Sequence, residues 1–216
     1  MFNNLRCFID KIKPNFVEGG KFAWLQSTFE AFETFVFTPN RVTKRGCHVR
    51  DAVDLKRAMI TVVIALVPAM LFGMWNIGYQ NSLHSAEWPY ELGTAASWWY
   101  CLWFGFLRLL PLLAVSYIVG LGIEFAFAQI RHHEVNEGFL VTGFLIPMIV
   151  PVTTPLWQLA LATTFAVIIA KEAFGGTGMN FLNPALVARA FLFFAYPTRM
   201  SGDNVWIAAD LWGTDA

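Results

Sequence analysis

The stretch GGTGMNFLNP, residues 175–184, places polar and side-chain-free residues between two strongly apolar runs. Glycines allow a backbone to come close to a flat or anionic group, and threonine and asparagine add uncharged hydrogen-bond donors and acceptors. The stretch contains no Cys, His or carboxylate, so it indicates a polar, planar, hydrogen-bonding ligand and not a metal. It fits equally well a tight turn in which the glycines have only a conformational role. The candidate ligand-binding residues are Gly175, Gly176, Thr177, Gly178, Asn180 and Asn183.

Asn183 and Pro184 predict the start of a helix, because Asn is a preferred N-cap and Pro suits the first helical position. The helix would extend over residues 184–196 and would present unpaired N–H groups and partial positive charge at its amino end. The spacing departs from both the Walker A loop and the dinucleotide fingerprint. Neither nucleotide-binding motif is therefore predicted.

Glu124 and Arg108 are charged residues inside a long apolar run. They are sixteen residues apart, which is about 24 Å along a helix, so they cannot pair with each other. A carboxylate inside a membrane is a functional hypothesis, often in an ion or proton path, and Glu124 is predicted to belong to one. The alternative is that each side chain extends to the nearby interface, which is the interpretation we favour for Arg108.

The elements that would position these residues are membrane helices. The chain has 216 residues, of which 56% are hydrophobic and only 14% charged. Residues 58–79 and 101–130 are long enough to span a bilayer, and Pro68 is expected to kink the first of them. Short apolar pieces follow at 139–150, 156–170 and 185–196, and interrupted segments of this kind mark binding sites in polytopic membrane proteins. We predict an all-α polytopic membrane protein with kinked and broken transmembrane helices.

The distribution of charge predicts the orientation of the chain. Ten of the fifteen Lys and Arg residues fall in residues 1–57, which also contain an amphipathic helical pattern at 22–37. Residues 80–100 have no Lys or Arg and are predicted to form an outside loop with an aromatic belt. Residues 1–57 would be a cytoplasmic basic and amphipathic segment on the membrane lipid, and 58–216 a membrane domain. The net charge of zero gives no indication of nucleic-acid binding.

Four stretches resemble the family of B subunits of the sodium-translocating NADH:quinone oxidoreductases, to which the D subunit of the Rnf complex is related. They are TKRGCHVRDAVDLKR (43–57), RHHEVNEGF (131–139), AKEAFGGTGMNFLNPALVARAFLFFAYP (170–197) and SGDNVWIAAD (201–210). The resemblance covers nearly the whole chain, and the stretch from Lys171 to Pro197 is the most specific part.

The resemblance implies a six-subunit respiratory complex in the bacterial inner membrane, which passes electrons from NADH to ubiquinone and pumps Na⁺ outwards. It implies a fold like half of a urea transporter, built from inverted repeats, with non-covalent riboflavin and an FMN bound to a threonine. The 175–183 stretch would belong to the riboflavin environment, where the amides of Asn180 and Asn183 could bond the flavin edge. Glu124 would take part in cation uptake. The quinone site would involve Gly120, Leu121, Trp24 and Lys56.

One departure from the family concerns the covalent FMN. The threonine that carries it lies in a Ser-Gly-Ala-Thr motif, which does not occur before Ala216, and Thr214 in WGTDA does not match. The sequence is therefore expected to be an N-terminal fragment, about half of the whole polypeptide and inactive by itself.

Three classes of function are consistent with the pattern of broken helices. The first is a redox component of an ion-translocating complex, either the NADH:ubiquinone type or an RnfD-like component of a ferredoxin:NAD oxidoreductase. The second is a channel for a small polar solute such as urea. The third is a membrane scaffold without a ligand. The specific resemblance favours the NADH:ubiquinone type.

Overall fold

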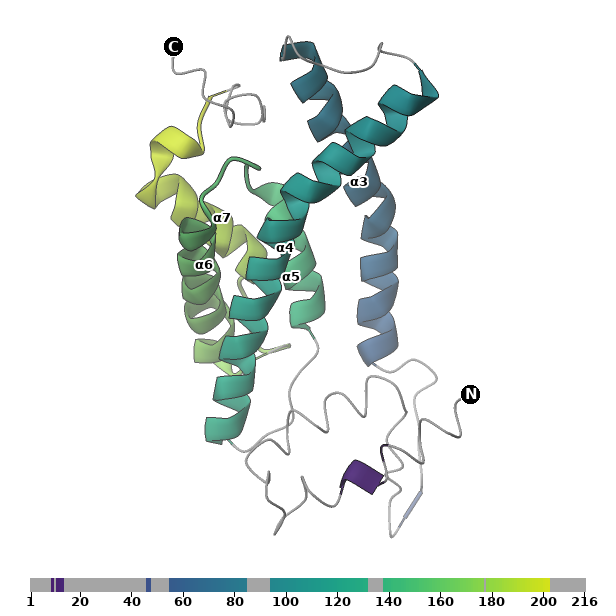
Figure 1. Ribbon diagram of the computed structural model, residues 1–216. Helices are drawn as coiled ribbons and strands as arrows, with labels where there is room; N and C mark the ends of the chain where they lie inside the picture. The colour runs from purple at the N-terminus through teal and green to yellow at the C-terminus, as the bar shows by residue number, and fades with distance from the viewer. Residues whose placement is uncertain are drawn as a thin grey trace.

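The structure is a computed structural model that describes residues 9, 11–13, 46–47, 55–84, 94–131, 138–176 and 178–202. Its main elements are helices, connected in the order shown in Figure 1. They are α3 (Leu55–His84), α4 (Ala95–Arg131), α5 (Phe139–Ile149), α6 (Leu156–Phe165), the π-helix η3 (Ala166–Lys171), the 3₁₀ helix η4 (Glu172–Phe174), α7 (Pro184–Ala195) and the 3₁₀ helix η5 (Pro197–Arg199). The amphipathic pattern at 22–37 lies outside the described residues.

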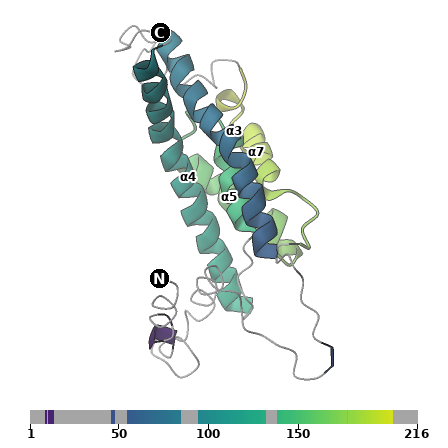
Figure 2. The same cartoon turned by 90° about the vertical axis from the view of Figure 1, so that its right-hand side faces the viewer.

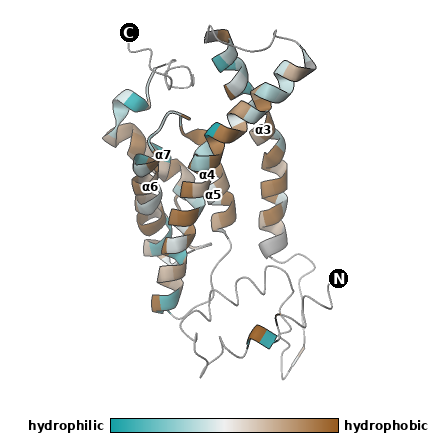
Figure 3. Ribbon diagram, viewed as in Figure 1, coloured by the Kyte–Doolittle hydropathy of each residue, from teal (hydrophilic) through white to brown (hydrophobic). Residues whose placement is uncertain are grey.

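Among the described residues, three stretches of helix are long and apolar enough to cross a membrane, namely Ala58–Leu83, Ala96–Arg131 and Leu156–Phe174. The first two confirm the predicted spans, and the part of the chain that the structure describes is all-α, as predicted for a polytopic membrane protein. Apolar residues predominate along these helices (Figure 3). The predicted loop at 80–100 is wrong at both of its ends, because α3 continues to His84 and α4 already begins at Ala95. Of the Trp residues expected in the loop, Trp98 and Trp99 lie instead near the start of α4, and Trp88 lies outside the described residues.

The length of the third span was underestimated from the sequence. The sequence indicated a piece that ends before Lys171, too short to cross a bilayer, but α6, η3 and η4 follow one another to give a 19-residue stretch, Leu156–Phe174. The reason is that Lys171 and Glu172 are buried, with 3% and 4% of their surface exposed. Each has a partner of opposite charge, so these charges do not end the helix at the membrane surface.

Helices α3 and α4 cross (Figure 1) and lie side by side in the view turned by 90° (Figure 2), and they approach each other very closely. A Cβ atom added to Gly105 of α4 would overlap the backbone of Met74, and one added to Gly78 of α3 would overlap the backbone of Cys101. Each helix thus contributes one glycine that receives the backbone of the other. Small residues allow this close approach in membranes, where van der Waals contact drives much of helix association.

A second packing centre lies among α4, α5, α6 and α7. Its buried residues are Leu112, Ile146, Val150, Leu159, Ala162, Ala166, Ala185, Ala188, Leu192 and Met200. Four of these ten are alanines, which bring α6, η3 and α7 close together. Helix α5 is fixed to α4 by two polar contacts: Ser116 Oγ donates to the Gly143 carbonyl (3.1 Å) and the Tyr117 hydroxyl to the Leu140 carbonyl (2.6 Å). The short α5 is therefore held at a defined depth beside α4.

Candidate functional site

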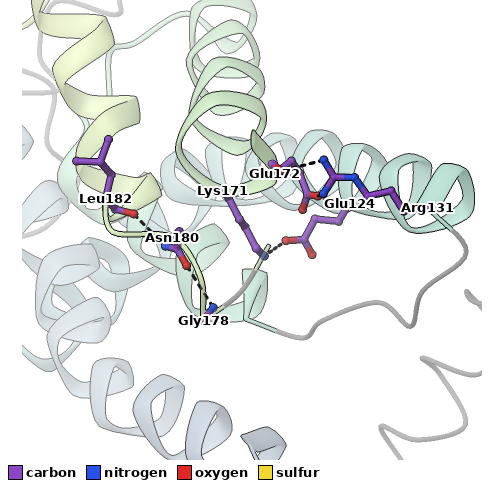
Figure 4. Close-up of polar contacts among 7 residues, drawn as sticks. All are labelled: Glu124, Arg131, Lys171, Glu172, Gly178, Asn180 and Leu182. Carbon is purple, nitrogen blue, oxygen red and sulfur yellow. Dashed lines mark hydrogen bonds and ion pairs between the residues drawn. The ribbon is translucent and has the colours of Figure 1, made fainter. Parts of the chain in front are cut away.

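Glu124, the carboxylate predicted to belong to an ion path, is buried and forms an ion pair with Lys171. Glu124 lies on α4 and Lys171 ends η3, and their side chains point toward one another from these two elements (Figure 4). The side chains of both are only 4% exposed. The pair involves Oε1 of Glu124, whereas Oε2 is buried with no hydrogen-bond partner among the described residues. Because an interior carboxylate is costly unless it is paired, Lys171 is what allows Glu124 to be charged here.

A second ion pair lies one residue further along the chain. Arg131, the last residue of α4, approaches Glu172 with its Nη1 atom 3.5 Å from Oε2, and its Nη2 donates to the Glu172 carbonyl oxygen at 2.9 Å. Arg131 also lies over the ring of Phe127, 5.3 Å from its centroid. The formal charges cancel within each of the two pairs, so neither pair carries a net charge.

The π-helix η3 ends at Lys171, within this charged cluster. A π-helix is wider than an α-helix and is often found at functional sites. Lys171 is the last residue of η3 and Glu172 the first of the 3₁₀ helix η4, and both are buried. Both side chains reach α4, where Lys171 pairs with Glu124 and Glu172 with Arg131. Consecutive residues of a regular α-helix would diverge by about 100°, because it has 3.6 residues per turn. The irregular helix thus allows both side chains to find partners on one neighbouring helix.

Phe139, the first residue of α5, lies beside the ion pair. It is fully buried, and its ring centroid is 5.7 Å from Nζ of Lys171. A Cβ atom added to Gly120 would overlap the same ring. Gly120 and Glu124 are one turn apart on α4, so the absence of a side chain at Gly120 admits the ring that borders the Lys171–Glu124 pair.

The glycines of the predicted ligand stretch have left-handed backbone conformations. The φ angles of Gly175, Gly176 and Gly178 are 107°, 95° and 93°. A Cβ atom at Gly178 would meet no protein atom within 4 Å, so its conformation, and not close protein packing, accounts for the glycine there. This agrees with the conformational role considered from the sequence, and the space beside the Cα atom of Gly178 is open.

The two asparagines organise the segment that joins η4 to α7. Asn180 accepts from the Gly178 amide at 3.3 Å and donates to the Leu182 carbonyl at 2.9 Å (Figure 4). Asn183 accepts from the Ala185 amide at 2.9 Å, and Pro184 occupies the first position of α7. The predicted helix start is therefore confirmed, and α7 ends at Ala195, one residue before the predicted end.

The remaining predicted residues are less informative. Gly120 is buried and Leu121 half-buried on α4, and the backbone of Lys56 lies in the first turn of α3. Trp24, Thr177 and the side chain of Lys56 lie outside the described residues. Arg108 has its guanidinium 5.4 Å from the ring centroid of Phe104.

Sequence reasoning missed Lys171 as the partner of Glu124, Arg131 as the partner of Glu172, and Phe139 as the ring beside Lys171. One signal could have indicated the first two. Lys171 and Glu172 follow an apolar run. Helix α4 contains an acid and a base, Glu124 and Arg131, whose charges are opposite to those of Lys171 and Glu172. No local pattern connects Phe139 to Gly120, because their contact joins two helices.

These features define the class of protein: a polytopic α-helical membrane protein with irregular helices and a buried, paired carboxylate. Residues 42–216 match the NQR2, RnfD, RnfE family, and the chain belongs to that family.

Curated relatives are named as the B subunit of the Na(+)-translocating NADH-quinone reductase. The protein of Stutzerimonas stutzeri (strain A1501) is 51% identical over 222 residues, which cover 95% of this chain and 55% of the relative. That of Pseudoalteromonas atlantica (strain T6c / ATCC BAA-1087) is 49% identical over 223 residues, with the same coverage. That of Pseudomonas aeruginosa (strain LESB58) is 46% identical over 222 residues, again with 95% of this chain and 55% of the relative covered. The chain spans about half the length of these relatives.

Proposed function

We propose that the chain forms the N-terminal part of the membrane component of a respiratory complex that couples electron transfer from NADH to ubiquinone with outward transport of Na⁺. The observation that carries the proposal is the 46–51% identity, over 95% of the chain, to proteins named as the B subunit of the Na(+)-translocating NADH-quinone reductase. The matched family also includes RnfD, but the names of these relatives favour NADH over ferredoxin as the electron source. The proposed location is the bacterial inner membrane, with the N-terminus in the cytoplasm and the other subunits of a six-subunit complex as partners.

Glu124 would supply the negative charge that attracts a cation. It lies inside a membrane span and is buried, and one of its two oxygens has no partner among the described residues. A carboxylate oxygen is a suitable ligand for a hard cation. In this proposal the ion pair with Lys171 is the resting arrangement of the site. The quinone-site residues inferred from the family, Gly120, Leu121, Trp24 and Lys56, stay predictions.

The segment before α7 would hold the riboflavin. Its side chains are uncharged, the space beside the Cα atom of Gly178 is open, and the amino end of α7 adds a partial positive charge. These properties fit a polar ring system without formal charge. When bound, riboflavin would supply the electron-carrying group, and the chain's own residues would bind and orient it. The FMN-bearing threonine is not assigned to any residue of this chain.

A Na⁺-dependence experiment tests the proposed function. The full-length gene would be expressed with its partner subunits, and inside-out membrane vesicles would be supplied with NADH and ubiquinone. We expect NADH oxidation that rises with Na⁺ and uptake of ²²Na⁺ into the vesicles. Uptake of Na⁺ that requires reduced ferredoxin as electron donor and NAD⁺ as acceptor, and does not occur with NADH and ubiquinone, would favour the RnfD-like alternative. Passage of urea without redox chemistry would favour the channel.

Replacing Asn183 by leucine is expected to reduce the riboflavin content of the complex. The change removes the hydrogen bond to the Ala185 amide, and loss of an N-cap costs about 1 kcal/mol of helix stability. Asn183→Ser is the matched control, since serine keeps a cap but not the amide. Flavins would be extracted and quantified by chromatography. An unchanged ratio of riboflavin to protein in Asn183→Leu would contradict the proposed role, and a loss in both variants would assign that role to the amide itself.

A further inference from the structure

We propose that Lys171 is a built-in cation that competes with the transported ion for the carboxylate of Glu124. The inference rests on the proposed function, and it adds a component for which the sequence alone indicated no role. Lys171 would be a positioning residue whose ammonium group controls how tightly the carboxylate can hold a second cation.

The first argument concerns occupancy. The Lys171 ammonium group is the partner of Glu124 Oε1, and both side chains are shielded from solvent. Oε2 of the same carboxylate is buried and lacks a partner among the residues described. A carboxylate has about four lone-pair positions, so Oε2 retains the capacity to bind an entering cation while Oε1 is paired with Lys171. The site can therefore be shared or exchanged between two cations.

The second argument concerns charge. With Lys171 in place, Glu124 is neutralised, and a second positive charge would leave an excess in a poorly solvated interior. Binding of a cation therefore favours withdrawal of the ammonium group. One feature gives that group another interaction, namely the ring of Phe139, whose centroid is 5.7 Å from Nζ. The cost of displacement is thus limited.

The consequence is a moderate affinity of the site for the transported ion. Transport requires that an ion bind well enough to enter and weakly enough to leave. A lone buried carboxylate would hold a cation tightly, whereas a tethered competitor lowers the affinity and restores a neutral site after the ion departs. The structural alternative is that the pair only links α4 to η3, and the two interpretations differ in their effect on cation affinity.

The test uses Lys171→Met in the intact complex, with turnover measured as a function of Na⁺ concentration. We expect the half-saturating Na⁺ concentration to fall by about fivefold or more, a typical lower value for coupling between two ligands of one protein. Maximal turnover should not rise, since release of the ion becomes slower. Lys171→Arg keeps the competing charge and should show a half-saturating concentration equal to or above that of the parent.

The matched control is Arg131→Met, which removes the cation of the neighbouring pair at the same helix junction. It should leave the half-saturating Na⁺ concentration unchanged even if it lowers the thermal stability of the complex. An unchanged or raised half-saturating concentration in Lys171→Met, in a parent that depends on Na⁺, would overturn the inference alone. A parent without Na⁺ dependence would overturn the proposed function, and the inference with it.

A second neutral variant covers failure of assembly. Lys171→Gln keeps an N–H donor for Glu124 without its charge, and the same fall in half-saturating concentration is expected. If neither neutral variant assembles while Lys171→Arg assembles with the parent's Na⁺ dependence, the pair is a structural link, and this outcome also counts against the inference.

Discussion

Replacing Gly105 by alanine is expected to destabilise the membrane domain strongly. The added methyl group would overlap the backbone of Met74 on α3, and a backbone cannot move aside as a flexible side chain can. Overpacking a core costs about 1–3 kcal/mol when side chains can adjust, so we expect at least about 2 kcal/mol here. The measurement is the thermal unfolding midpoint of the detergent-extracted full-length protein, together with its elution profile.

The matched control for this prediction is Gly122→Ala on the same helix. A Cβ atom at Gly122 would meet nothing within 4 Å, so the same substitution should be neutral or slightly stabilising through better helix propensity. On α3, Gly78→Ala should be destabilising like Gly105→Ala, and Gly73→Ala is its control, because a Cβ atom at Gly73 would meet nothing within 4 Å. Equal unfolding midpoints for Gly105→Ala and Gly122→Ala would show that α3 and α4 do not cross in the way described.

Replacing Glu124 by glutamine is expected to impair Na⁺-dependent turnover while leaving the flavin content unchanged. The change keeps the size of the side chain but removes the charge that would attract the cation, and the ammonium group of Lys171 loses its counter-charge. We expect the half-saturating Na⁺ concentration to rise by about tenfold or more, which corresponds to about 1.4 kcal/mol of lost binding free energy. Steady-state NADH oxidation at varied Na⁺ measures it, with flavin extraction as the parallel readout.

Glu172→Gln is the control for this experiment, because Glu172 is equally buried and also paired, but with Arg131 at the end of α4. It should lower stability without shifting the half-saturating Na⁺ concentration. Identical Na⁺ dependence in Glu124→Gln and the parent would remove Glu124 from the ion path.

The local features of the fold could be predicted from the sequence. Asn183 and Pro184 specify the start of α7 through a side-chain cap and a fixed backbone angle, and both effects are confined to one turn. The two long spans follow from their apolar length alone. In each case the information lies in neighbouring residues, so no knowledge of the tertiary structure was needed.

The features that depend on distant contacts could not be predicted. Lys171 looked like the end of a short apolar run, because the residue that neutralises it, Glu124, lies 47 positions earlier in the chain. Likewise, nothing near Gly105 in the sequence indicates that it faces the backbone of Met74, whereas Gly122, on the same helix, faces open space. The candidate site belongs largely to this second kind, since its ion pairs join α4 to the irregular end of the third span.

The length of α4 has a consequence for how the protein sits in a bilayer. Its 37 residues extend about 55 Å, whereas the hydrocarbon core is about 30 Å thick. Tilting by the usual range of about 0–40° cannot absorb this difference, so at least one end of the helix reaches the headgroup region or beyond it. Glu124 is seven residues, or about 10 Å, from the carboxyl end at Arg131. If the excess length emerges at that end, the charged cluster lies at the border of the membrane, where hydration from the aqueous phase shortens the route that an ion must travel without water.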